Sequence, residues 1–327
     1  MLPDASADYY RKQQGITLEL LAIASDIWGS RPPKDFDRWF ASNVDMLMEL
    51  VLAGQARAIA GADAYVADVL DEIGVSIAAD AVTAPDGLIG VASDGRALDT
   101  LMYGAVITSK GRIAKGLSTS QAWASGLDVL VNRLQTQVAD ASRVSTSLSI
   151  ATRRRVGYVR MLNPPSCSKC AVLAGKFYRY SAGFLRHPGC DCRHIPSTEN
   201  TSGDMTTDVD AYFTSLSEDL QNKYFTKAGA QAIRDGADVN QVANARRDMQ
   251  TAQVFGRDLL TTTVGVSRRG VAYRAMSNAG YANRGTDVRS GGRFRARAPR
   301  LMPESIYQIA ESRDDALRLL KLYGYLA

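Results

Sequence analysis

Apolar residues recur every three or four positions along most of the first 156 residues, which is the spacing of amphipathic helices. Asp35 precedes the clearest stripe, which consists of Phe36, Phe40, Val44, Leu47 and Val51. Gly54 falls next on this stripe and is expected to weaken or end the helix there. Further helices are predicted over 63–83, near 96–115 and from about Ser120 to Arg153. Long stripes of this kind predict helices that pack on one another in a bundle.

The pattern changes at Val156, where the short run of β-branched and aromatic residues before Asn163-Pro164-Pro165 predicts a strand that ends in a turn. Ser166 is predicted to cap a short helix that ends at Gly175. The residues after it, KFYRY, look extended, and CRHIP is interpreted as a return strand. Residues 157–198 therefore predict a small α+β unit, which is too short to own a large core.

Helical patterns resume at Asp208 in the segments DVDAYFTSLS, FTKAGAQAIRDG and VNQVANARRDMQ. Residues 261–299 lose apolar periodicity and are rich in Gly, Arg, Ser and Asn, which predicts a long extended arm. Order returns with Pro303 at a first helical position and Ser312 as the cap of a last helix. The predicted fold class is mainly α, with a small α+β Cys/His-rich domain in the middle and an extended basic arm near the C-terminus. The expected division of the chain is 1–156, 157–198, 199–260, 261–300 and 301–327.

The composition is that of a globular protein, because 46% of the 327 residues are hydrophobic and 22% are charged. The composition alone therefore argues against wholesale disorder and against a disulfide scaffold. No run approaches the 18 or so apolar residues of a spanning helix, and the first residues lack the layout of a signal peptide. We expect a protein made in the cytoplasm, with no membrane partner.

The net charge of +5 is distributed unevenly. Residues 153–193 hold nine basic residues and one acid, and residues 268–300 hold nine arginines and one acid, so the rest of the chain is acidic. Local positive charge of this kind favours an acidic partner.

All four cysteines and both histidines fall within residues 167–194, in the spacing C-x2-C-x16-H-x2-C-x-C-x-H. Two short chelating elements of this type are typical of a tetrahedral zinc site. The predicted ligands, with the histidines as substitutes, are Cys167, Cys170, Cys190, Cys192, His187 and His194. The alternatives are reduced buried thiols or disulfides formed later. His187 could instead brace its loop, and His194 could be a satisfied core residue.

The same residues carry a resemblance to a known family. The order strand, N-P-P, C-x2-C, A-x-L-x-G, an aromatic pair and H-P-x-C-x-C-x-x-x-P resembles the Mu F-like minor head proteins of tailed bacteriophages. The motif is carried here by Cys167, Cys170, Leu173, Gly175, His187, Pro188, Cys190, Cys192 and Pro196. Residues 225–249 and 301–325 look similar to the downstream parts of versions from phages of actinobacteria.

The resemblance implies a minor capsid protein of the virion, assembled in the host cytoplasm, that acts at or near the portal in head morphogenesis and DNA packaging or delivery. Its expected partners are portal or other capsid proteins and phage DNA, with no small-molecule substrate and no enzymatic activity. A zinc-containing nuclease is the alternative, but it needs a general base and metal carboxylates, and residues 167–199 offer few. A capsid protease or a thioredoxin-like redox role lacks its motif.

The arginines of the predicted arm are candidate contacts for nucleic acid or for an acidic protein, because guanidinium groups pair with phosphates and stack on planar groups. A merely solvated loop is the alternative. The candidate residues are Arg268, Arg269, Arg274, Arg284, Arg289, Arg293, Arg295, Arg297 and Arg300.

Overall fold

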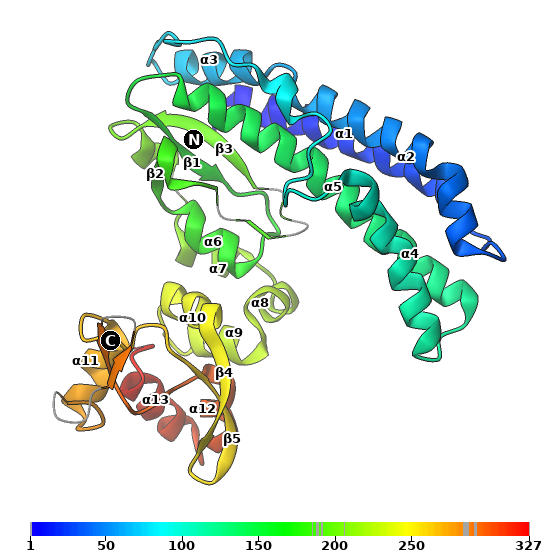
Figure 1. The fold of residues 1–327 in the computed structure, drawn as a ribbon. Coiled ribbons are helices and arrows are strands. Elements are labelled where there is room, and N and C mark those ends of the chain that lie inside the picture. The colour runs from blue at the N-terminus through cyan, green and yellow to red at the C-terminus, as the bar shows by residue number, and fades with distance from the viewer. Residues whose placement is uncertain are drawn as a thin grey trace. The chain divides into compact units, whose positions relative to one another are not determined.

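The computed structural model describes residues 2–184, 186–187, 190, 192–205, 207–283, 288–290 and 293–326. The chain forms two units, each with its own hydrophobic core (Figure 1). The first consists of Met1–Met161 and Lys176–Thr206, and the second of Leu162–Gly175 and Thr207–Ala327. The fold is mainly α with a small α+β part, as predicted.

Helices build most of the first unit. They are α1 (Asp4–Trp28), α2 (Phe36–Ile59), α3 (Ala62–Glu72), α4 (Leu98–Ala114) and α5 (Thr119–Ala151), with a short 3-10 turn η1 (Pro85–Leu88). Helices α1, α2 and α5 contact one another, and α4 packs on α2 and α5 (Figure 1). Their shared core includes the stacked rings of Trp28 and Trp123, whose centroids are 3.9 Å apart. No helix in the described part of the chain combines the length and hydropathy that a membrane crossing requires.

Two helix ends differ from the prediction. Helix α2 begins directly after Asp35, which caps it, but it continues through Gly54 to Ile59. Gly54 lies at a close approach between helices, where a Cβ would come within 2.6 Å of Leu20 and 3.0 Å of Val138. The helix predicted over 63–83 ends at Glu72, and the chain turns at Gly74, whose φ is +74°.

A three-stranded antiparallel sheet closes the first unit. Its strands are β1 (Val156–Met161), β2 (Phe177–Arg179) and β3 (Arg193–Thr198), in the order β2-β1-β3, and the 3-10 turns η2 (Tyr180–Ala182) and η3 (Ser202–Met205) follow β2 and β3. The sheet packs on α3 and α5 through a second core that includes Tyr65, Ile150 and Ile195. The strands predicted on both sides of the cysteine segment are therefore confirmed.

The second unit contains α6 (Ser168–Ala174), which packs with α7 (Val209–Ser215) and α10 (Val239–Ala245). Cys167 is the cap residue of α6 in place of the predicted Ser166, whose hydroxyl donates to the Asn163 carbonyl instead. The other elements of this unit before the sheet are α8 (Glu218–Phe225), α9 (Lys227–Arg234) and η4 (Arg246–Asp248).

The prediction of an extended arm over 261–299 is wrong. Strands β4 (Met249–Val254), β5 (Arg257–Thr262) and β8 (Arg300–Leu301) form a sheet, and β6 (Val288–Ser290) pairs with β7 (Arg293–Arg295). Helix α11 (Val271–Asn278) buries Tyr273 and Met276 in a core shared with α12 (Pro303–Ile309) and α13 (Arg313–Leu322). The apolar residues of this stretch are mostly small and irregularly spaced, so they fill a core without a helical or strand period.

Candidate functional site

The cysteine and histidine residues lie on two short segments, one that includes the start of α6 and one that leads into β3. Cys167 caps α6 and Cys170 lies in its first turn, whereas Cys190 and Cys192 directly precede β3. His194 is the second residue of β3 and pairs with Arg160 of β1. Pro188, Gly189 and Asp191 lie outside the described residues.

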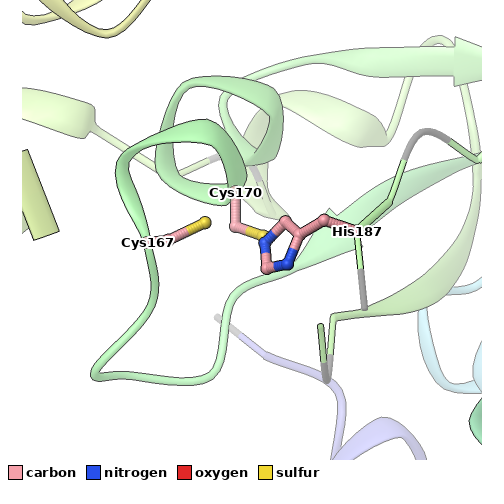
Figure 2. A group of neighbouring side chains, drawn as sticks. All are labelled: Cys167, Cys170 and His187. Atoms are coloured by element: carbon pink, nitrogen blue, oxygen red, sulfur yellow. The ribbon is translucent and has the colours of Figure 1, made fainter. Parts of the chain in front are cut away.

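Five of the six predicted ligands fall into two overlapping groups. The metal-binding atoms of Cys167, Cys170 and His187, which Figure 2 shows, all lie within 4.8 Å of one another. The sulfur atoms of Cys170, Cys190 and Cys192 lie within the same distance of one another. Tetrahedral zinc with Zn–S bonds of about 2.3 Å holds its sulfur ligands roughly 3.8 Å apart. These side chains are therefore close enough to bind a metal ion, and Cys170 belongs to both groups.

The thiols of Cys170, Cys190 and Cys192 are buried, whereas Cys167 and His187 are half-buried. The four cysteines are present as thiols. A buried set of soft donors suits zinc or another thiophilic ion better than calcium or magnesium, which prefer oxygen ligands.

His194 is separate from both groups. The residue is 1% exposed, and its ring packs against the rings of Tyr158 and Phe184, at centroid distances of 4.4 and 4.2 Å. Its Nε2 atom shares a hydrogen bond of 3.0 Å with the hydroxyl of Ser147. Burial, followed by the charges of neighbouring arginines, holds the pKa of His194 well below its usual value. The structure thus favours the core role for His194 over the ligand role.

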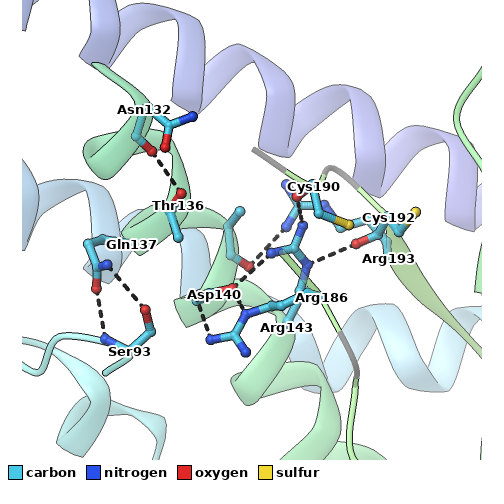
Figure 3. A network of polar contacts seen from close by, with 11 residues as sticks. Ser93, Asn132, Thr136, Gln137, Asp140, Arg143, Arg186, Cys190, Cys192 and Arg193 are labelled. Carbon is cyan, nitrogen blue, oxygen red and sulfur yellow. Dashed lines mark hydrogen bonds and ion pairs between the residues drawn. The ribbon is translucent and has the colours of Figure 1, made fainter. Parts of the chain in front are cut away.

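A buried ion-pair network on α5 holds the segment that carries Cys190 and Cys192. Arg143 donates from Nε to the Cys192 carbonyl at 2.8 Å and from Nη2 to the Cys190 carbonyl, and it pairs with Asp140 (Figure 3). Asp140 also accepts two hydrogen bonds from Arg186, which raise the pKa of that guanidinium. Two backbone carbonyls are thereby fixed by one buried side chain.

Sequence reasoning missed this network. The available signal was that Asp140 and Arg143 interrupt the otherwise small and apolar face of α5 around Val138 and Ala141. A buried pair three residues apart on a helix requires partners, and here the partners come from a segment about 46 residues further along the chain.

Several basic residues within 153–193 make contacts in the interior of the first unit. Arg153 donates to the carbonyl of Ser149, Arg193 donates to the carbonyl of Ala139, and the guanidinium of Arg160 lies 3.9 Å from the centre of the Phe184 ring. The side chains of these three arginines are buried. The interpretation of the whole window as charge available to a partner was therefore wrong for these residues.

The arginines of residues 268–300 are likewise in part buried and in part exposed. Arg300 is fully buried, and its guanidinium donates to the carbonyls of Tyr323, Val264 and Gly324, so its assignment as a partner contact is wrong. Arg268 stacks over the ring of Phe294 at 4.1 Å and, like Arg295, is half-buried. Arg284 and the side chain of Arg293 lie outside the described residues. The exposed members are Arg269, Arg274, Arg289 and Arg297.

The fold and the cysteine segment define a class of helical protein with a small sheet beside a cluster of potential metal ligands. A family model described as VG15 protein matches residues 4–218, about two thirds of the chain. The chain therefore belongs to the VG15 protein family, which indicates a phage-encoded protein. Neither the curated proteins nor the solved structures contain a significant match.

Proposed function

We propose that the protein is a minor capsid protein that acts at or near the portal in head morphogenesis and in DNA packaging or delivery. The observation that carries this proposal is the extent of the family match, which spans the helices of the first unit, its sheet and the whole cysteine segment. The Mu F-like motif occupies the same segment, so the phage family and the minor-head resemblance coincide on the same residues.

The positions of the two histidines fit a protein that binds its partners and does not catalyse a reaction. His194 is buried and bonded to Ser147, and His187 lies beside the thiols of α6. A general base must be able to reach a substrate, and these two are the only imidazoles in the sequence. This arrangement gives no support to the nuclease alternative, and we assign the protein a mechanical role among the virion proteins.

Zinc is the metal that we propose for the cysteine cluster. The donor set is three buried thiols with a further thiol and an imidazole nearby, and zinc accepts four such ligands. In a structural site of this kind the ion stabilises the local fold and supplies no chemistry.

The test of the proposed function uses phage particles. We expect mass spectrometry of purified virions to detect the protein at far fewer copies than the major capsid protein, and cross-linking to join it to the portal. Loss of the gene should produce heads that are malformed or that fail to retain DNA, and expression of the gene in trans should restore them. Normal, filled particles that lack the protein would refute a role in the head.

A further inference from the structure

A cavity of about 410 Å³ in the first unit carries an excess of positive charge. It is walled by α5, by the start of α4 and by the loop before it, and Arg186 and His187 complete the wall. Three guanidinium groups line it, from Arg96, Arg133 and Arg186. Figure 3 shows the lining residue Asp140, which pairs with both Arg143 and Arg186.

The carboxylates of the cavity are already engaged. Asp94 accepts a hydrogen bond of 2.8 Å from Nε of Arg96, and Asp140 is shared by Arg186 and the buried Arg143. Within the described part of the chain, no carboxylate lies within 4.0 Å of the guanidinium of Arg133. Among the described residues, Arg133 is thus the lining guanidinium that has no ion pair within this distance, although the charge of the nearby Asp94 partly offsets its own.

The guanidinium of Arg133 is held in place although no carboxylate of the described residues pairs with it within 4.0 Å. Its Nη1 atom donates to the Leu101 carbonyl of α4, and its guanidinium lies so close to Gly104 that a Cβ there would overlap it. Burial, followed by the nearby charge of Arg96, lowers the pKa of Arg133. A partly desolvated cation beside a second cation is an electrostatically unfavourable arrangement, which a bound anion would relieve.

We propose that this cavity binds a phosphate group. Arginine forks match the geometry of phosphate oxygens, and the three arginines line the cavity together with the polar residues Asn132 and Thr136. The described lining residues include no phenylalanine, tyrosine or tryptophan ring, so the cavity suits a phosphate better than a stacked base. The site is independent of the arginines in residues 268–300 and of the role proposed above.

The experiment measures phosphate binding to the full chain. Inorganic phosphate should bind saturably in isothermal titration calorimetry and should raise the unfolding temperature more than chloride does at equal ionic strength. Arg133→Gln should weaken that binding about tenfold or more, because a charge-assisted hydrogen bond is lost. Arg154→Gln is the matched control, since Arg154 is an exposed arginine of the same unit that pairs with Asp80.

Competition identifies the source of the phosphate. Displacement by a short DNA duplex indicates a backbone phosphate, whereas displacement by a phosphomonoester and not by the duplex indicates a small ligand; both support the site. If Arg133→Gln fails to fold, Arg96→Gln is used, because that side chain is half exposed. Equal affinity in the pocket variant and in Arg154→Gln, or a wild type that responds to phosphate no more than to chloride, overturns the proposal.

Discussion

Cys170 is the residue on which both groups of potential ligands depend. Its sulfur lies within 4.8 Å of the donor atoms of Cys167 and His187, and within the same limit of the sulfurs of Cys190 and Cys192. No other described residue belongs to both groups. A single substitution there therefore removes a donor from either of the two sets that could hold the ion.

We predict about one zinc ion per chain of purified protein, measured by elemental analysis with a parallel thiol count. Cys170→Ser should lose the metal and lower the unfolding temperature, because a bound structural metal ion stabilises the folded segments that hold it. Cys167→Ser, which affects one of the two groups, should retain more metal. Native protein with no metal and four rapidly reacting thiols would contradict the assignment.

At the scale of elements, marked caps made some helices predictable. Asp35, Asp208 and Ser312 each accept hydrogen bonds from backbone amides at the start of a helix, and the predicted helical patterns begin at or directly after these residues. The hairpin of β4 and β5 was missed because its turn, Phe255-Gly256, is not a common hairpin sequence. The helical pattern before it also extends into β4.

The candidate site was likewise predictable from the sequence only in part. The chelating cysteines are close in sequence, so their proximity could be predicted from spacing alone. The contacts of Arg186 with Asp140 and of Arg143 with the Cys192 carbonyl join residues more than 40 positions apart. They depend on how the sheet packs on α5, which local periodicity does not specify.

Alanine substitution is expected to have opposite effects on stability at two glycines, Gly126 of α5 and Gly111 of α4. A Cβ at Gly126 of α5 would come within 2.7 Å of the Trp28 ring and 3.1 Å of the Ala105 carbonyl, so the helices could not keep their distance. At Gly111 of α4 a Cβ would meet nothing within 4 Å. Helix propensity alone favours alanine by about 1 kcal/mol at either position.

We therefore predict that Gly126→Ala lowers the free energy of unfolding by about 1–3 kcal/mol, as overpacking does. Gly111→Ala should raise it by up to about 1 kcal/mol. Urea unfolding followed by circular dichroism measures both values. A Gly126→Ala protein as stable as Gly111→Ala would show that α4 and α5 do not approach each other closely at this point.

At the scale of the whole molecule, the family match and the arginine-rich stretch of residues 268–300 fall on different parts of the chain. The match ends at residue 218, whereas the arginine-rich stretch begins at 268 and folds with the C-terminal helices. Arg300 belongs to the interior of that unit, where its guanidinium lies 4.1 Å from the centre of the Tyr325 ring. The charge that remains available to a partner is thus smaller than the sequence suggested, and it lies on folded structure.

DNA binding by this surface would depend on the exposed side chains and not on Arg300. If phage DNA is the partner, log K should fall linearly with log salt, and the triple change of Arg269, Arg274 and Arg297 to Ala should reduce that slope by at most about 2.7. The equivalent change of the exposed Arg11, Arg57 and Arg154 in the first unit is the control for net charge. Fluorescence anisotropy with a labelled duplex at several salt concentrations measures both slopes. If the two triple variants keep the slope of the wild type, these arginines do not contact phosphate, and an acidic surface on a capsid or portal protein becomes the partner to test.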